Sequence, residues 1–325
     1  MVEFSKIKLD KTDRKILFEL DKNCRIPAST LAKKVHKSRQ TVEYRINQLM
    51  KNGIITGFQT SFNPHKIGYK LYKIYLRLRN IPEERQELIT YLHRAGNVYW
   101  MGECSGIWDL VAGIFAKNDY ELFEFKNELI SKFTNVIIKE AEGTYIDVLQ
   151  YPKMYFTNEL CTHTLFAGEI VHNKLDDLDY AILGEIVNQA RMPITELARR
   201  TKTTPAIVRR RLKQLEEKGV ILQYRVGIDL NKLGLELYKA IIKVDRYTKD
   251  DDRKMREYLA RLPNVHYFIR HMWQLEPEIV ADNYQEYYEI IENLKKAFPH
   301  VIRTVDSVLM ITDEWTPGFK NLLKA

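Results

Sequence analysis

Two groups of cationic and hydrogen-bonding side chains, one in each half of the chain, have the chemistry needed to bind nucleic acid. Arginine and lysine neutralise phosphates, and arginine and glutamine carry donors that match base edges in a major groove. The second group has seven basic residues and no acidic one between Arg199 and Lys213. The candidate DNA-contacting residues are Lys37, Ser38, Arg39, Gln40, Tyr44, Arg45, Thr204, Arg209, Arg210, Arg211 and Lys213. A charge run is more often a solvated helix face, so the elements that carry these residues must decide between the two interpretations.

Those elements belong to a long internal repeat. Residues 9–73 and 175–239 align without a gap at an offset of 166 residues (175 − 9). Self-similarity over such a length means that one chain carries two copies of the same structural unit.

The start of each copy predicts three helices. Candidate N-caps in the first copy are Asp10 and Thr12, Ser29 and Thr30, and Ser38, one set for each helix in turn. An apolar stripe along the third helix is formed by Val42, Ile46, Leu49 and Met50, and Gly53 follows where a helix commonly ends. The second copy repeats this design, which has the proportions of a helix-turn-helix DNA-binding motif.

The remainder of each copy predicts a second domain. In the first copy, strands are expected at 71–78, 98–104, 110–115 and 136–149, with helices at 82–95 and 119–131. The second copy gives strands at 237–244, 265–270, 275–281 and 301–312, with helices at 250–262 and 284–297. This β-α-β-β-α-β order is the ferredoxin-like arrangement, so the predicted fold class is α+β.

Composition sets broad limits on what the chain does. The net charge of +8 is compatible with nucleic-acid binding, and 45% hydrophobic residues are ordinary for a soluble globular protein. No segment has the roughly 20 apolar residues that span a bilayer, and we see no secretory signal. Three separated cysteines favour a reducing cytoplasm. The sequence shows no nucleophile–base pair, cofactor motif or metal-ligand spacing, so we expect no catalytic residue, no cofactor and no metal.

The chain resembles the Lrp/AsnC (leucine-responsive, feast/famine) transcription regulators, twice over. The resemblance is carried by the LDxxDxxIL openings at 9–17 and 175–183, the RxP segments at 25–27 and 191–193, and the RxxxLxxxG(I/V)I segments at 45–55 and 211–221. It implies DNA binding by the helix-turn-helix units and dimerisation through the ferredoxin-like, or RAM, domains. It also implies that an amino acid or similar small effector is bound.

The landmark of the effector domain in that family is a GxxD turn between its second and third strands. Gly106 and Asp109 supply it in the first copy, and the resemblance makes them the effector-binding candidates. A structural hairpin turn explains the same two residues slightly better at each position. The second copy departs from the pattern, with His271 and Gln274 at the aligned positions, so the two halves should not bind an effector alike.

Family members are usually two-fold dimers of single-copy chains, and we expect the two copies here to form a pseudo-dimer within one chain. Further assembly is not visible in the sequence. The expected domains are helix-turn-helix units at 1–62 and 175–228, ferredoxin-like units at 63–158 and 229–325, and a linker at 159–174.

An enzyme is the competing interpretation. Siroheme decarboxylases are similar to this family, also occur as tandem or paired units, and use histidine and arginine near a tetrapyrrole. Here His266, Phe268 and Arg270 would share one face of a strand, because successive side chains alternate. The fuller decarboxylase pattern is absent around them. A third alternative, a sensor or scaffold whose helix-turn-helix units contact proteins, is not required by any residue.

Overall fold

The computed structural model describes residues 7–272, 274–315 and 318–323 and contains both predicted tri-helical units. The first consists of α1 (Lys11–Lys22), α2 (Ala28–Lys34) and α3 (Arg39–Lys51), and the second of α6 (Asp177–Ile186), α7 (Ile194–Arg200) and α8 (Pro205–Glu217). The apolar stripes of α3 and α8 are buried except for Met50, which is exposed. Asp10 and Ser38 cap α1 and α3 as predicted. The predicted caps Ser29 and Thr30 are wrong, because α2 begins after Pro27 and has no side-chain cap.

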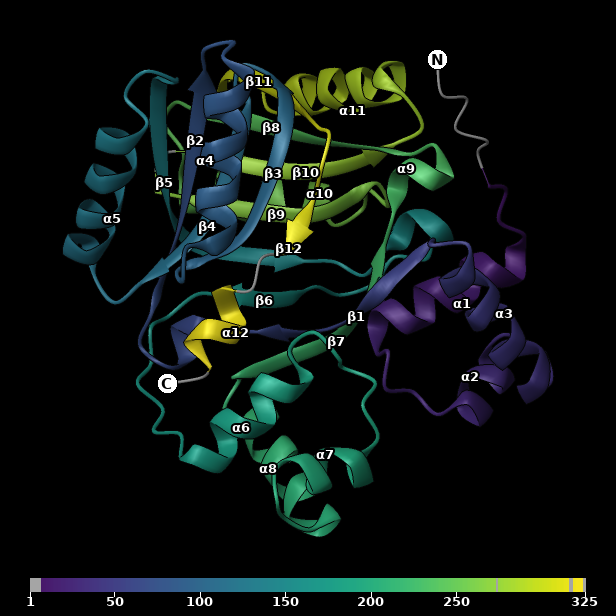
Figure 1. Cartoon of the computed structure of the whole chain (residues 1–325). Coiled ribbons are helices and arrows are strands. Elements are labelled where there is room, and N and C mark those ends of the chain that lie inside the picture. Colours follow the sequence, from purple (N-terminus) through teal and green to yellow (C-terminus); the bar gives the residue numbers. More distant parts are fainter. Residues whose placement is uncertain (1–6, 273, 316–317, 324–325) are drawn as a thin grey trace.

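A two-stranded ribbon joins the two tri-helical units (Figure 1). It pairs β1 (Ile55–Phe62) with β7 (Ile221–Ile228) in antiparallel fashion, and we call it the wing ribbon. Gln59 lies opposite Arg225 in this ribbon. These are equivalent positions of the two copies (225 − 59 = 166), so the pseudo-two-fold axis of the chain passes between them.

Each ferredoxin-like domain forms a four-stranded sheet. The first contains β2 (Lys70–Leu78), α4 (Pro82–Arg94), β3 (Val98–Gly106), β4 (Leu110–Ala116), α5 (Asp119–Lys132) and β5 (Ile137–Gln150), with strand order β5-β2-β4-β3. The second contains β8 (Glu236–Val244), α10 (Lys249–Leu259), β9 (Val265–His271), β10 (Gln274–Ala281), α11 (Tyr284–Ala297) and β11 (Ile302–Met310), with strand order β11-β8-β10-β9. The predicted α+β class and the β-α-β-β-α-β order are confirmed.

The two sheets join at both edges. Strand β5 pairs with β9 and β3 pairs with β11, which closes the eight strands into a ring. Tyr72, Ile74 and Leu76 pack beneath the first domain's helices, while Leu71, Lys73 and Tyr75 alternate with them on the opposite face. That inner face therefore buries polar side chains as well as apolar ones.

Short elements complete the chain. They are η1 (Pro64–Lys66), η2 (Met154–Phe156), β6 (Thr164–Ala167), α9 (Leu230–Leu233), β12 (Glu314–Trp315) and α12 (Gly318–Leu322). The predicted linker is not wholly irregular, because β6 within it pairs with β5. Near the C-terminus, α12 lies between the first sheet and α6 (Figure 1), and the Phe319 ring stacks on Tyr99 at 4.5 Å. No helix within the described residues is long and apolar enough to cross a membrane.

Candidate nucleic-acid interface and the cavity on the pseudo-two-fold axis

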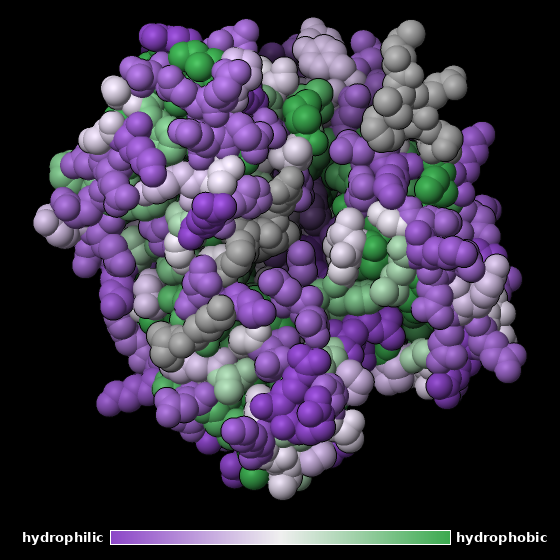
Figure 2. Space-filling view, in the orientation of Figure 1, coloured by the Kyte–Doolittle hydropathy of each residue, from purple (hydrophilic) through white to green (hydrophobic). Residues whose placement is uncertain are grey.

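The third helices α3 and α8 both carry an exposed face. In Figure 1 the first tri-helical unit lies at the right and the second at the bottom, both outside the ring of eight strands, and hydrophilic side chains form much of the surface in these regions (Figure 2). Arg39 and Tyr44 on α3 are 68% and 64% exposed, and Arg209 and Arg210 on α8 are also exposed. Side chains on these faces are therefore accessible to a duplex.

Two of the predicted contact residues hold their own domain together. Arg45 Nη1 lies 2.6 Å from Asp10 and 2.9 Å from Asp13. Arg211 makes the equivalent contacts, at 2.7 Å to Asp176 and 3.3 Å to Asp179. Both pairs tie the third helix to the first helix of the same unit. In the sequence, the two aspartates of each LDxxD opening recur at the same spacing from the arginine, but the spacing alone does not indicate that they meet it.

Ser38 and Thr204 also have local roles. Each side-chain oxygen accepts a hydrogen bond from a backbone N–H of the helix that it begins, that of Thr41 at 3.1 Å and that of Ile207 at 3.3 Å. Such a cap fixes where the third helix starts. A hydroxyl at a helix start can still face a phosphate, so DNA contact by these two residues stays a prediction.

The remaining cationic side chains of the predicted interface differ in whether they already form ion pairs within the protein. Arg39 pairs with Glu43 at 2.8 Å, and Lys213 lies 3.7 Å from Glu217. Within the part of the chain that the structure describes, Lys37, Arg209 and Arg210 lie in no ion pair. These three side chains, with the exposed Gln40 and Tyr44, form the most available part of the predicted interface.

The cations of α7 are mostly neutralised by their own neighbours. Glu196 accepts hydrogen bonds from Arg199 and Arg200, which lower the pKa of its carboxyl to about 2. Arg200 also lies 3.0 Å from Glu185. The seven basic residues between Arg199 and Lys213 therefore carry less free charge than the sequence indicates.

The GxxD turn is occupied by structural contacts. Asp109 Oδ2 accepts from the backbone N–H of Leu78 at 2.8 Å, and the Gly106 carbonyl accepts from Arg77 at 2.7 Å. Gly106 has a φ of +134°, and a Cβ there would lie 2.5 Å from the Ser307 carbonyl oxygen. The turn thus needs glycine for its backbone and its packing on β11. Effector binding by Gly106 and Asp109 stays a prediction.

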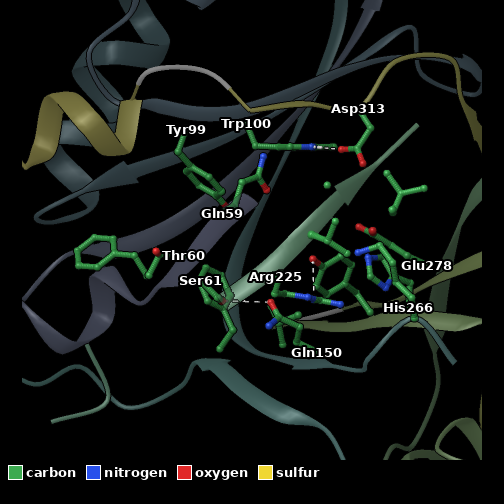
Figure 3. A pocket seen from close by; sticks show the side chains of 18 of the residues that line it. Gln59, Thr60, Ser61, Tyr99, Trp100, Gln150, Arg225, His266, Glu278 and Asp313 are labelled. Atoms are coloured by element: carbon green, nitrogen blue, oxygen red, sulfur yellow. Dashed lines mark hydrogen bonds between the residues drawn. The ribbon is translucent and has the colours of Figure 1, made fainter. Parts of the chain in front are cut away.

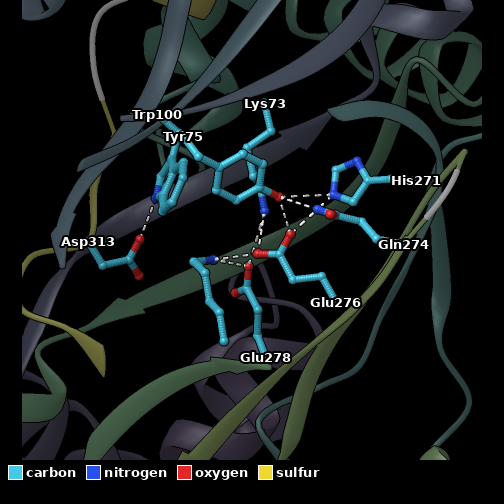
Figure 4. Close-up of polar contacts among 9 residues, drawn as sticks. Lys73, Tyr75, Trp100, His271, Gln274, Glu276, Glu278 and Asp313 are labelled. Atoms are coloured by element: carbon cyan, nitrogen blue, oxygen red, sulfur yellow. Dashed lines mark hydrogen bonds and ion pairs between the residues drawn. The ribbon is translucent and has the colours of Figure 1, made fainter. Parts of the chain in front are cut away.

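In the second copy, the residues that replace the GxxD turn help to build a buried polar cluster (Figure 4). His271 Nε2 lies 3.1 Å from Glu276, and Gln274 donates to the hydroxyl of Tyr75 at 3.1 Å. Tyr75 in turn donates to Glu276 at 2.6 Å. This cluster joins β10 of one sheet to β2 of the other.

Two lysines and two glutamates extend this cluster between the sheets. Lys73 lies 2.8 Å from Glu276 and 3.9 Å from Glu278, and Lys239 pairs with both glutamates. The lysines are equivalent residues of the two copies (239 − 73 = 166), while both carboxylates come from β10. All four side chains are buried, so the formal charges balance inside the fold.

A cavity of about 140 Å³ lies on the pseudo-two-fold axis, between the wing ribbon and the sheets (Figure 3). Gln59 and Arg225, which define the axis in the ribbon, both line it. His266 lines it as well, but Arg270 does not, because Arg270 pairs with Asp147 and Asp252. His266 and Arg270, which the enzymatic interpretation places on one face of a strand, therefore do not face the same cavity.

Comparison with known proteins shows that both halves of the chain match the same family. The family described as "Winged helix-turn-helix DNA-binding" matches residues 9–56 and 175–221. The HTH-type transcriptional regulator LrpC of Bacillus subtilis is 35% identical over 30% of this chain and 66% of its own length. The HTH-type transcriptional regulator Ptr1 of Methanocaldococcus jannaschii is 31% identical over 39% of this chain and 86% of its own length. One such regulator thus corresponds to one half of this chain.

Among solved structures, the crystal structure of the siroheme decarboxylase NirDL has the same arrangement over 97% of both chains, with a TM-score of 0.64. The sequence identity is 14%, so this likeness shows the shared fold alone.

Proposed function

Because this chain is a tandem-duplicated member of the Lrp/AsnC family of helix-turn-helix regulators, we propose that it regulates transcription as a sequence-specific DNA-binding pseudo-dimer. The observation that supports the proposal is that α3 and α8 each have an exposed polar face and that the wing ribbon joins their two tri-helical units. Two such helices can enter successive major grooves on one side of a duplex, about 34–36 Å apart.

The two reading faces differ, so the two half-sites should differ as well. At one pair of equivalent positions α3 presents Glu43 and α8 presents Arg209. At the next, Tyr44 is matched by Arg210. A carboxylate accepts from a cytosine amino group, whereas an arginine donates to a guanine edge. A single-copy homodimer reads a palindrome, whereas this fused chain is suited to an asymmetric operator.

Selection of bound sequences from a random duplex pool tests the proposal with the full chain. We expect two unlike half-sites whose centres lie about 10–10.5 base pairs apart, or a multiple of that spacing. Recovery of a perfect palindrome would contradict independent reading by α3 and α8. Failure to enrich any sequence, at low salt and with intact folding, would contradict the DNA-binding function itself.

Replacing two residues of the α3 reading face by their α8 equivalents makes this experiment sharper. Glu43→Arg with Tyr44→Arg gives α3 the arginines of α8. The selected half-sites should then become more alike, because both helices present the same pair. A matched control is Glu257→Arg on the exposed face of α10, which should leave the selected sequence unchanged.

Modulation by an amino-acid-like effector and further assembly of pseudo-dimers are finer proposals that follow from family membership. Siroheme decarboxylation is the second candidate function, supported by the His266 side chain at the cavity. The volume of the cavity argues against decarboxylation, because about 140 Å³ is below the roughly 300–1,000 Å³ typical of sites for larger organic ligands. Incubation with siroheme and measurement of its absorption spectrum distinguishes the candidates, and a stable spectral shift with loss of carboxyl groups would favour the enzyme.

A further inference from the structure

The cavity on the pseudo-two-fold axis is lined by equivalent positions that have diverged between the copies. Gln59 in the first wing corresponds to Arg225 in the second. Tyr99 corresponds to His266, at the offset of 167 residues that also relates Asn97 to Asn264. In a symmetric homodimer each pair would be identical. Here the cavity has two unlike ends, so it can hold one asymmetric molecule in one orientation.

The end of the cavity near Arg225 holds two cationic side chains and one carboxylate. Asp21 is buried and accepts from Lys153 Nζ at 2.8 Å and from Arg225 at 2.6 Å. One carboxylate against two cations leaves a net charge of +1 (−1 + 1 + 1) among these three side chains. Asp313, which also lines the cavity, is a further carboxylate whose charge acts on Lys153, and it accepts a hydrogen bond from Trp100. The counterparts in the other copy, Gln59 for Arg225 and Val187 for Asp21, carry no charge.

This end also has hydrogen-bonding capacity that the fold does not use. Lys153 Nζ has three donors and, within the described residues, one hydrogen-bond partner, Asp21. Burial lowers the pKa of the Lys153 ammonium to about 8, against the opposing effect of Asp21. A second anion beside it would therefore favour the charged form.

His266 is the second unused group. Its side chain lines the cavity and is 9% exposed, and its buried Nδ1 has no hydrogen-bond partner among the described residues. Burial, and next the charges of Lys153 and Arg225, hold the pKa of His266 well below its usual value. A neutral imidazole donates from one ring nitrogen, so it can complete a set of donors around a carboxylate without adding buried charge.

The volume and the rest of the lining limit the size and shape of the ligand. A cavity of about 150 Å³ accommodates benzene, so about 140 Å³ holds a molecule of roughly six to eight non-hydrogen atoms. The apolar side chains of Val148, Ile269 and Phe319 also line the space. A short apolar tail is therefore favoured beyond the charged end.

We propose that this cavity binds one compact monocarboxylate per chain, with its carboxylate toward Lys153, Arg225 and His266 and its short apolar tail toward Val148 and Ile269. The site is separate from the GxxD turn. Strands β1 and β7 form part of the cavity wall and join the two tri-helical units. Binding of the carboxylate in the cavity would therefore also affect the position of one tri-helical unit relative to the other. That last consequence rests on the proposed DNA-binding function, whereas binding itself does not.

Isothermal titration of the full chain without DNA tests the site with three probes of one skeleton: isovalerate, isopentanol and isopentylamine. We expect isovalerate to bind in the millimolar range or tighter with one molecule per chain. The neutral alcohol should bind at least about 10-fold more weakly, since hydrogen bonds to charged groups are the stronger ones. The amine should not bind. Absence of isovalerate binding, equal binding of all three, or two molecules per chain would overturn the proposal.

Two variants locate the binding. Lys153→Met removes one of the two cations and its hydrogen-bond donors and leaves Asp21 paired with Arg225, so it should weaken isovalerate binding at least about 10-fold while the fold persists. His266→Phe removes the imidazole nitrogens at similar size and should also weaken binding. Lys243→Met, at an exposed position on β8, is the matched control and should bind as the parent does. Unchanged affinity in Lys153→Met and His266→Phe would place the ligand elsewhere.

DNA binding is measured separately, with and without isovalerate. Loss of the DNA-binding function would leave the titration result standing, and loss of isovalerate binding would leave DNA binding standing. The two proposals therefore fail independently.

Discussion

The contrast between neighbouring arginines on α8 gives the most direct test of how this protein meets DNA. Arg209 and Arg210 are exposed and lie in no ion pair within the described residues, whereas Arg211 pairs with Asp176 and Asp179. All three are adjacent in sequence and carry the same charge. We therefore predict that Arg209→Ala/Arg210→Ala impairs DNA binding, whereas Arg211→Ala impairs folding.

The magnitude follows from counterion release. Each cation that neutralises a phosphate contributes about 0.9 to the slope of log affinity against log salt, so removal of two cations from the DNA-binding face lowers the slope by up to about 1.8. Between about 50 and about 200 mM salt, a slope change of 1.8 corresponds to a roughly 12-fold difference in how far affinity falls. The stability of the double variant should change by less than about 0.5 kcal/mol, because both side chains are exposed.

Arg211→Ala should show the opposite pattern. It leaves Asp179, which is 4% exposed, without its arginine and with the backbone N–H of Asp176 as a donor, and loss of a charged hydrogen-bond partner by a buried carboxylate costs about 1–3 kcal/mol. Its salt slope should match that of the parent chain, because Arg211 is already neutralised by two carboxylates.

Fluorescence anisotropy with a labelled duplex across a salt series measures the slope, and urea unfolding measures the stability. Arg45→Ala, the equivalent variant in the first copy, serves as the matched control and should behave as Arg211→Ala does, because it loses contacts with Asp10 and Asp13. The reasoning is refuted if the double variant keeps the parental slope, or if Arg211→Ala lowers the slope by as much as one of its neighbours.

Three further predictions concern the fold that positions the helices. Glu276→Gln should lower the free energy of unfolding by about 3–5 kcal/mol, because it leaves two buried lysines with one carboxylate; urea unfolding checks this, and Lys73→Met in the same chain should restore part of the loss. Lys73 and then His271 hold the pKa of Glu276 well below its usual value, despite burial. The ionised Glu276 therefore stabilises the fold fully above the pKa of an unfolded glutamate, and this stabilisation is lost as the pH falls toward the folded pKa. The free energy of unfolding should thus fall more steeply with decreasing pH in the parent than in Glu276→Gln, as acid unfolding will measure. Gly106→Ala should destabilise the fold by roughly 1–3 kcal/mol or more, since φ is +134° and Ser307 is in the way, with the shift of the thermal midpoint as the readout.

The sequence by itself determined the elements and the repeat, because these depend on short-range physics. Helix periodicity located α3 and α8, and the caps Asp10, Ser38 and Thr204 follow from backbone N–H groups that a neighbouring oxygen can reach. The order of the predicted strands and helices indicated the ferredoxin-like arrangement. The predicted caps Ser29 and Thr30 failed at that same short range, because Pro27 already occupies the position that begins α2.

Only the tertiary structure decided which charged side chains are available for DNA and which form ion pairs within the protein. Arg45 and Arg211 look like their neighbours in sequence, but their partners lie 32 to 35 residues away. The cavity depends on still longer separations, since Gln59 meets Arg225 only when β1 pairs with β7, and Asp21 on α1 meets Lys153 across 132 residues. Local propensity carries no information about contacts between segments so far apart. The pairing of the two copies fixes them, because it places equivalent but diverged residues face to face on one axis.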